Sequence, residues 1–154
     1  SSMLLSLLLG DSFSILDVGA GVYRQYAAPR RVRELGIESR FRSAWGTSVR
    51  VADIPSDPAR VAQELIPVAK QIRKDDQPDV LILGCTGLSM VSERIRQSLD
   101  IPVIDASVAA LTMAEMCVRG NWLHSSKTYP APSRKQRRMP EGYQLYQPLG
   151  SSNK

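Results

Sequence analysis

The apolar residues of this chain fall into two kinds of run that alternate along residues 1–120. Short apolar runs of strand length cover residues 13–16, 41–45, 80–83 and 101–104. Between them, apolar residues recur every three or four positions, which is the spacing of one face of a helix. Strands that alternate with helices predict a parallel sheet with right-handed crossovers. The pattern therefore indicates an α/β fold with a four-stranded parallel sheet flanked by helices.

Helix-capping residues and prolines indicate where the predicted helices begin and bend. Asp57 and Pro58 form a typical helix start, a capping residue followed by proline in the first turn. Pro29 and Pro67 fall inside predicted helices, where a missing N–H predicts a kink or a break. The predicted helices cover residues 2–9, 22–35, 58–74, 88–99 and 107–118.

A thiol follows the third predicted strand directly. Residues 80–83 are apolar at every position, which is typical of a strand covered on both faces, and Gly-Cys-Thr-Gly follows at 84–87. Ligands bind at this carboxyl edge of an open α/β sheet, and N–H groups at a helix start there can hold an anion and favour a thiolate. Cys85 is therefore the candidate catalytic residue, suited to proton transfer at an activated carbon. Thr86 and Gly87 are candidate substrate-binding residues through their N–H groups.

A second turn should lie at the same edge of the sheet. Asp17, Val18 and Gly19 come after the first predicted strand, and glycine at 19 and 21 permits close approach of the backbone to a ligand. These three residues are further candidates for substrate binding through backbone donors. The turn lacks the third glycine of the dinucleotide fingerprint, and no Gly-Lys-Ser/Thr of a phosphate loop follows. Asp105 ends the fourth strand and could either cap the next helix or line the site.

Either cysteine could instead have a structural role without any chemistry. A free cysteine is often a small core residue, and Cys117, on the apolar side of a predicted helix, is expected to be one. Neither cysteine has metal-ligand spacing and the chain has one His, so no metal site is expected. Without a partner His or a second cysteine at redox spacing, acyl transfer and disulfide chemistry at Cys85 are disfavoured.

The net charge of +5 is concentrated in the tail. Residues 1–120 hold 14 Lys/Arg and 14 Asp/Glu, whereas residues 121–154 hold six basic residues and one acidic residue. A basic tail with several prolines on a neutral body predicts an irregular, solvated extension, not a nucleic-acid surface.

The apolar segment 3–9 is too short to span a bilayer and lacks the features of a signal peptide, so no membrane partner is expected. Few cysteines in an α/β pattern favour a cytoplasmic location.

Four segments, in order between residues 3 and 132, carry a resemblance to a known family. They are residues 10–15, 83–87, 101–105 and 124–130. Together they resemble the second half of the aspartate/glutamate/hydantoin racemase superfamily, with residues 83–87 matching its second cysteine motif. Gly87 stands where glutamate and aspartate racemases commonly have His, so the resemblance favours the hydantoin-racemase-like branch.

The resemblance implies a fold and a mechanism. It implies two flavodoxin-like α/β domains that face each other across a cleft, each supplying one cysteine, and racemisation by two-thiol proton transfer without a cofactor. Cys85 would be the acid/base of the second domain, and Thr86, Gly87 and residues 17–19 would bind a small carboxylate or hydantoin substrate. Hydroxyl residues are common in that branch where Asp17 and Val18 stand.

By this interpretation the chain is one half of such an enzyme. Residues 1–10 would be the linking helix from a missing first domain, 11–106 the α/β domain with Cys85, 107–120 a return helix, and 121–154 the irregular tail. The apolar helix at 2–9 needs a cover, so the expected partner is the first domain or a second copy of the chain. Two other functions stay open: a one-cysteine decarboxylase or cis–trans isomerase of the same superfamily, and a non-catalytic binding or assembly domain.

Overall fold

Four parallel strands form the centre of the protein. The strands are β1 (Phe13–Val18), β2 (Phe41–Thr47), β3 (Val80–Leu83) and β4 (Val103–Asp105). Their spatial order is β2-β1-β3-β4, and each neighbouring pair is parallel. The predicted four-stranded parallel sheet is therefore confirmed. β1 runs two residues further than the sequence suggests, so Asp17 and Val18 belong to the strand and not to the turn after it.

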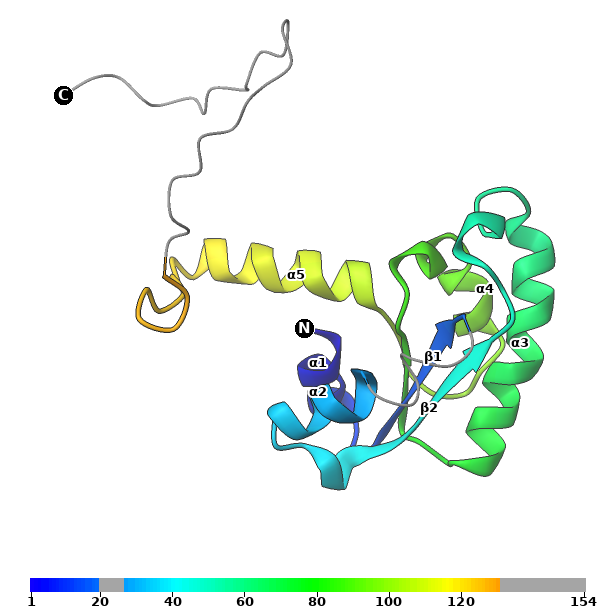
Figure 1. Ribbon diagram of the computed structural model, residues 1–154, viewed down its shortest axis with the longest axis horizontal. Helices are drawn as coiled ribbons and strands as arrows, with labels where there is room; N and C mark the ends of the chain where they lie inside the picture. The colour runs from blue at the N-terminus through cyan, green and yellow to red at the C-terminus, as the bar shows by residue number, and fades with distance from the viewer. Residues whose placement is uncertain (20–26, 131–154) are drawn as a thin grey trace, which may run out of the picture. The chain divides into compact units, whose positions relative to one another are not determined.

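The computed structural model describes residues 1–19 and 27–130. The helices of these ranges are α1 (Ser2–Leu9), α2 (Ala28–Glu34), α3 (Pro58–Asp75), α4 (Ser92–Gln97) and α5 (Ala106–Arg119), with short 3₁₀ helices η2 (Glu38–Arg40), η3 (Val51–Asp53) and η4 (Thr86–Met90). Figure 1 shows α3 and α4 on one side of the sheet and α1 and α2 on the other. The chain divides into two units, Ser1–Trp122 and Leu123–Lys154. Residues 121–130 form turns without a helix or strand.

The sheet has a hydrophobic core on each face. Leu81 and Leu83 of β3 pack in a cluster with apolar residues of α3 and α4. Val80 and Ile82 of the same strand pack in a second cluster with residues of α1 and α2. All four are at most 1% exposed, so the uniformly apolar run at 80–83 reflects burial on both faces.

Two predicted helices differ from those observed. The helix expected at 88–99 is instead η4 followed by the short α4, which begins at Ser92. Ser92 Oγ donates to Ser89 O at 3.0 Å, a side-chain hydrogen bond of the kind that competes with helical pairing. The helix expected at 22–35 is α2, with Pro29 in its first turn, where the missing N–H removes no helical bond. Residues 22–26 of that prediction lie outside the described residues.

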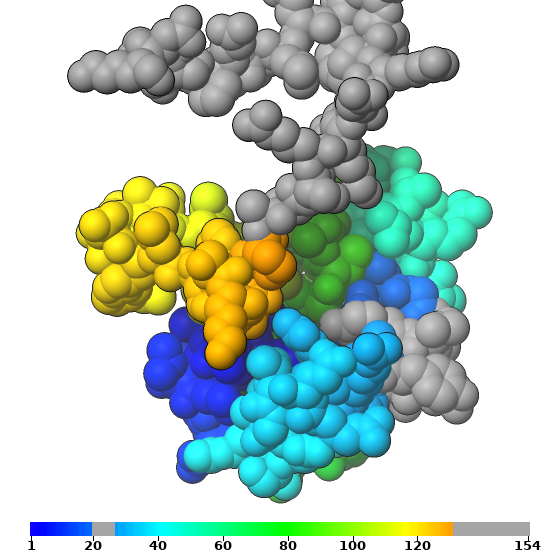
Figure 2. Space-filling model, turned by 60° about the vertical axis from the view of Figure 1, so that its left-hand side comes forward, coloured from blue at the N-terminus to red at the C-terminus, as the bar shows by residue number. Residues whose placement is uncertain are grey.

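α5 leaves the sheet and carries much of its apolar surface uncovered. Asp105 caps it by accepting hydrogen bonds from Ser107 N and Val108 N, which confirms the capping alternative for this residue. Beyond Ala109 the helix runs away from the sheet, and it stands beside α1 (Figures 1 and 2). The exposed large apolar side chains of α1 and α5 are Leu4, Leu8, Leu9, Val108, Leu111, Met116 and Val118. Among the described residues, no helix combines the length and hydropathy needed to cross a membrane.

Candidate functional site

The sheet has a topological switch point between β1 and β3. The chain leaves β1 towards α2, whose Ala28 and Val32 pack on one face, and it leaves β3 towards η4 and α4 on the other face. Opposed connections of this kind open a crevice at the carboxyl ends of the two strands, where ligands bind in open α/β sheets. Leu16 pairs with Leu83, so Asp17 and Gly84 are the next residues on the two sides of this crevice.

Cys85 follows β3 at this crevice. Its side chain is half-buried and packs against the core on the α3/α4 face, and its Sγ lies 3.6 Å from where a Cβ on Gly87 would stand. The first hydrogen bond of η4 runs from Leu88 N to Cys85 O at 3.0 Å. The N–H groups of Thr86 and Gly87 precede that bond, so they have no acceptor within η4. A thiol and two backbone donors thus come from three consecutive residues.

The helix start at Cys85 is weaker than the sequence suggests. η4 is a five-residue 3₁₀ helix, and Val91 separates it from α4. Because 3₁₀ hydrogen bonds are poorer and the aligned run of peptides is short, η4 supplies a smaller dipole than the expected α-helix. An anion at this loop would therefore be bound by local N–H groups and not by the dipole of a long helix.

The expected backbone donors after β1 are already used. Val18 N donates to Asp17 Oδ1 at 2.7 Å, and Gly19 N donates to Val49 O at 3.1 Å. Gly19 has a φ of 80°, a conformation that favours glycine. The structure therefore brings Asp17, Val18 and Gly19 to the same sheet edge as Cys85, but it leaves the N–H groups of Val18 and Gly19 without a free hydrogen to offer a substrate.

The carboxyl group of Asp17 is the group that sequence reasoning missed. Asp17 is 8% exposed, and burial raises the pKa of its carboxyl above the ordinary value of 3.8, while the Val18 N–H acts in the opposite direction. Its Oδ2 lies 2.9 Å from where a Cβ on Gly84 would stand. The available signal was the polar residue at the end of an otherwise apolar strand run, followed by glycine.

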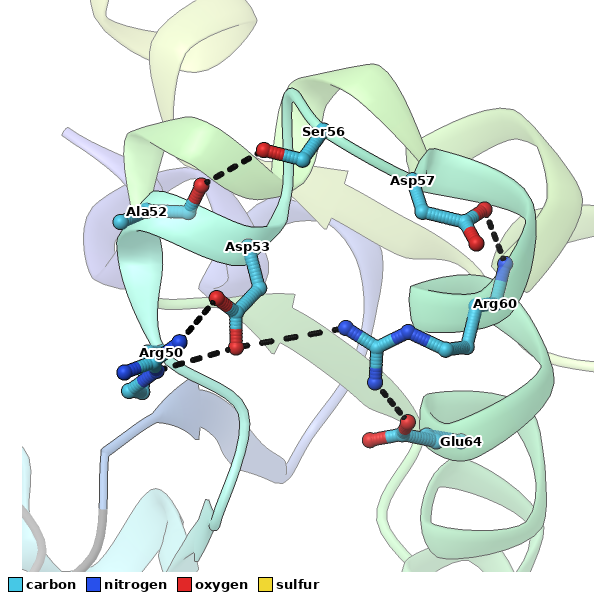
Figure 3. Close-up of polar contacts among 7 residues, drawn as sticks. All are labelled: Arg50, Ala52, Asp53, Ser56, Asp57, Arg60 and Glu64. Atoms are coloured by element: carbon cyan, nitrogen blue, oxygen red, sulfur yellow. Dashed lines mark hydrogen bonds and ion pairs between the residues drawn. The ribbon is translucent and has the colours of Figure 1, made fainter.

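The loop after β2 packs onto the segment that carries Cys85. This segment, Gly84 to the end of η4, is called the cysteine loop. Ile54 Cδ1 lies 3.0 Å from the Cβ position of Gly87. Figure 3 shows how polar contacts join this loop to the first turns of α3: Asp53 pairs with Arg50 at 2.8 Å and with Arg60 at 4.0 Å, and Arg60 also pairs with Glu64. The hydrogen bond from Arg50 is the main reason that the pKa of Asp53 is lowered. These exposed pairs are screened by solvent and contribute little to stability, and the Asp53–Arg60 pair links the loop that carries Ile54 to α3.

Asp105 fixes the far end of the cysteine loop. Its Oδ1 accepts from Ser89 Oγ at 2.9 Å, in addition to the two N–H groups of α5. Its Oδ2 is buried and has no hydrogen-bond partner among the described residues. Asp105 thereby ties η4, β4 and α5 together.

Three other features of the described residues do not add to this site. Among residues 1–19 and 27–130, no group of three or more His, Cys, Asp and Glu could hold a metal ion. Cys117 lies on α5, and the His124 ring stacks edge-on against Tyr129. A hollow of about 600 Å³ opens beside the end of α1, but its Arg73 is paired with Asp100 and its Asp79 accepts from Ser12.

Comparisons with known proteins show the family of this chain. The family model described as Asp/Glu/Hydantoin racemase matches residues 1–114. The chain is 28% identical over 137 residues to the hydantoin racemase of Pseudomonas sp. (strain NS671), covering 88% of this chain and 54% of that protein. It is 29% identical over 102 residues to the hydantoin racemase of Rhizobium meliloti, covering 66% and 42% respectively.

Solved structures give the same picture. Allantoin racemase from Pseudomonas fluorescens superposes with a TM-score of 0.72 and 26% identity over 88% of this chain and 57% of that one. Allantoin racemase from Klebsiella pneumoniae has a TM-score of 0.77, and at 21% identity it supports the fold alone. The chain thus spans about half the length of the relatives it matches.

Proposed function

Because this chain belongs to the aspartate/glutamate/hydantoin racemase family, we propose that it is the half of a cofactor-independent racemase that carries the second catalytic cysteine. The similarity to hydantoin racemases places it in the hydantoin-like branch, and the proposed substrate is an amino-acid derivative of the hydantoin type. The observation that carries the proposal is a half-buried thiol at the β1/β3 switch point, next to two N–H groups that lack acceptors in η4.

The proposed chemistry is proton transfer at the carbon next to a carbonyl. The Cys85 thiolate takes the proton, so the C–H bond breaks, an S–H bond forms, and the electron pair delocalises onto the carbonyl oxygen. Donors placed where negative charge develops stabilise such an enolate most in the transition state, which is the role proposed for Thr86 N and Gly87 N. Inversion needs an acid on the opposite face of the carbon. The other cysteine of the chain, Cys117, lies on α5, so the proposed acid is a thiol from the other half of the enzyme.

The uncovered apolar surface supports a missing partner. Leu8 on α1 is 81% exposed, and Leu111 on α5 is 63% exposed. Large apolar side chains that gather at the surface often mark an interaction site. The relatives are about twice as long as the matched region, and we propose that their other half, or a second copy of this chain, covers α1 and α5.

The test compares H/D exchange, which one thiol can catalyse, with inversion, which needs two thiols. A single thiol can remove the C5 proton of a hydantoin and return deuterium on the same face. In D₂O, the chain should therefore catalyse H/D exchange at C5 of one 5-methylhydantoin enantiomer, seen by NMR, with little inversion by chiral chromatography. Cys85→Ser should abolish the exchange, whereas Cys117→Ser should leave it unchanged. Exchange that survives Cys85→Ser would overturn the proposed role of Cys85. Inversion as fast as exchange, at a rate independent of protein concentration, would overturn the half-enzyme interpretation.

One alternative has specific support. Since Cys85 is the cysteine at the crevice and Cys117 is elsewhere, a one-cysteine decarboxylase or cis–trans isomerase fits the same loop. In decarboxylation the C–CO₂⁻ bond breaks, CO₂ leaves, and the Cys85 thiol protonates the carbanion. Turnover of phenylmalonate or maleate, without C5 exchange of hydantoins, would favour this alternative.

A further inference from the structure

The crevice beside Cys85 has a hydrogen-bond acceptor on the β1 side. Asp17 follows Ile15 on the α2 face of the sheet, whereas Cys85 follows Leu83 on the α4 face, so the two side chains approach the crevice from opposite faces. Neighbouring strands lie about 4.8 Å apart, which places both residues within the span of one small ligand. Asp17 and Cys85 therefore lie at the ends of neighbouring strands, on the two sides of one crevice.

Within residues 1–19 and 27–130, only one oxygen of Asp17 accepts a hydrogen bond. Oδ1 accepts from Val18 N at 2.7 Å, and this bond fixes the orientation of the carboxyl group. Oδ2 receives no hydrogen bond from the described residues, and in contrast to Asp105 Oδ2 it is not sealed from solvent. A carboxyl group that is 8% exposed with one open oxygen is poorly solvated, which agrees with the raised pKa of Asp17. A ligand that donates to Oδ2 would supply the missing hydrogen bond.

Gly84 makes this oxygen reachable from β3. An added Cβ at Gly84 would stand 2.9 Å from Oδ2 and 3.0 Å from Ile15 Cγ2. The carboxyl group thus fits against bare backbone, one residue before the thiol. Any larger residue at 84 would cover Oδ2.

The donors on the β3 side of the crevice and the acceptor on the β1 side match the groups on either side of the acidic carbon of a hydantoin. In a hydantoin, the acidic C5 lies between the carbonyl at C4 and the N–H at N1. Thr86 N and Gly87 N suit the carbonyl oxygen, and the open oxygen of Asp17 suits the N–H. We propose that Asp17 is a specificity residue whose Oδ2 accepts a hydrogen bond from the N–H next to the carbon that Cys85 deprotonates. This inference rests on the proposed function, and it assigns to the Asp17 side chain the contact that the occupied backbone donors of Val18 and Gly19 cannot make.

The test compares three ligands and two proteins. The rate of Cys85 alkylation by iodoacetamide is measured by peptide mass spectrometry in rising concentrations of 5-methylhydantoin, its N1-methyl derivative and its N3-methyl derivative. Alkylation of Cys117 in the same samples is the internal control. The variant is Asp17→Asn, which keeps an oxygen for Val18 N and places an NH₂ donor where Oδ2 stood. Its cooperative urea unfolding verifies that it folds.

Wild type should require roughly tenfold more of the N1-methyl ligand than of the parent for half-protection, the size of effect expected for one hydrogen bond to a charged group. The N3-methyl ligand should protect as well as the parent does. In Asp17→Asn, the parent should protect no better than its N1-methyl derivative. Equal protection by all three ligands in wild type, or a tenfold N1 preference that persists in Asp17→Asn, would overturn the role of Asp17 and leave the proposed function standing. Failure of every ligand to protect Cys85 in wild type would overturn both.

Discussion

Gly84 is the residue at which the two central strands and the candidate site meet. Its N–H donates to Leu16 O at 2.8 Å, which ends the pairing of β1 with β3. A side chain there would meet the Asp17 carboxyl group at 2.9 Å and Ile15 at 3.0 Å, and both are buried. Since buried neighbours cannot move aside freely, even one methyl group is too much at this position.

Gly84→Ala should therefore reduce the free energy of unfolding by about 1–3 kcal/mol, the usual cost of overpacking a core. Gly87→Ala is the matched control, because a Cβ there meets one atom at 3.0 Å, Ile54 Cδ1, and the next at 3.6 Å, so it should cost less than Gly84→Ala. Urea unfolding followed by circular dichroism measures both. Equal losses in the two variants would contradict the steric explanation.

Asp17 also makes stability depend on pH in an unusual direction. Burial raises its pKa in the folded chain, so between 3.8 and that raised value the folded chain binds more protons than the unfolded chain. The free energy of unfolding contributed by this group is then highest below 3.8 and falls as the pH rises through the folded pKa.

Asp17→Asn keeps the acceptor for Val18 N and removes the buried charge. Relative to wild type, the variant should gain stability as the pH rises from 3.8, with the gain levelling off above the folded pKa. Asp79→Asn is the opposite case, because hydrogen bonds led by that from the Ser12 side chain lower the pKa of Asp79. Its loss relative to wild type should be full above 3.8 and disappear as the pH falls through the lowered pKa. Urea unfolding at a series of pH values tests both, and curves of the same sign would show that one assignment is wrong.

Among the elements, the sequence predicts strands better than the turns that carry the site. Residues 80–83 are apolar throughout because the strand is buried on both faces, and that burial is visible in the sequence. The end of β1 is misread because Asp17 and Gly19 usually mark a turn, whereas here Asp17 stays in the strand by pairing with Gly46 of β2. The bond from Gly19 N to Val49 O depends on how β2 lies beside β1, which no local pattern encodes. The position of Cys85 is thus predictable, but the donors and acceptors around it are not.

Two helix caps of the same residue type should differ in strength. Asp57 caps α3 at an exposed position by accepting one hydrogen bond from Arg60 N, so Asp57→Ala should cost about 1 kcal/mol. Asp105 caps α5, and it also holds Ser89 of the cysteine loop from a position that is 4% exposed. Asp105→Ala leaves three donors without their acceptor, and it should cost about 2–4 kcal/mol. Chemical unfolding measures the two losses, and a cost for Asp105→Ala no larger than for Asp57→Ala would contradict the linking role of Asp105.

The molecule as a whole has apolar surface that its own elements do not cover. Val118 and Leu8 are each 81% exposed, and they lie on the two helices that stand side by side in Figure 2. In the described residues, the sheet is therefore covered on both faces, whereas α1 and α5 are only partly packed.

The isolated chain should consequently self-associate. Sedimentation velocity should show an average mass that rises with concentration, and Leu8→Lys combined with Leu111→Lys should lower that mass by introducing charge on the two helices. Val51→Lys is the control, because Val51 is 59% exposed and belongs to η3, not to α1 or α5, and it should leave association unchanged. A clean monomer of the unmodified chain at high concentration would contradict this prediction.

The strand order has a consequence for how the chain folds during synthesis. β1 is a central strand, and Phe13 pairs on one side with Phe41 and on the other with Val80, 67 positions later in the sequence. At 5–20 residues per second, a ribosome needs about 3–13 s to make that interval. Throughout it, the β3-facing edge of β1 has no strand to pair with, and Ile15 has only part of its core. This interval is the period in which a nascent chain is most exposed to aggregation, so a chaperone that binds extended apolar segments should be most effective before β3 emerges.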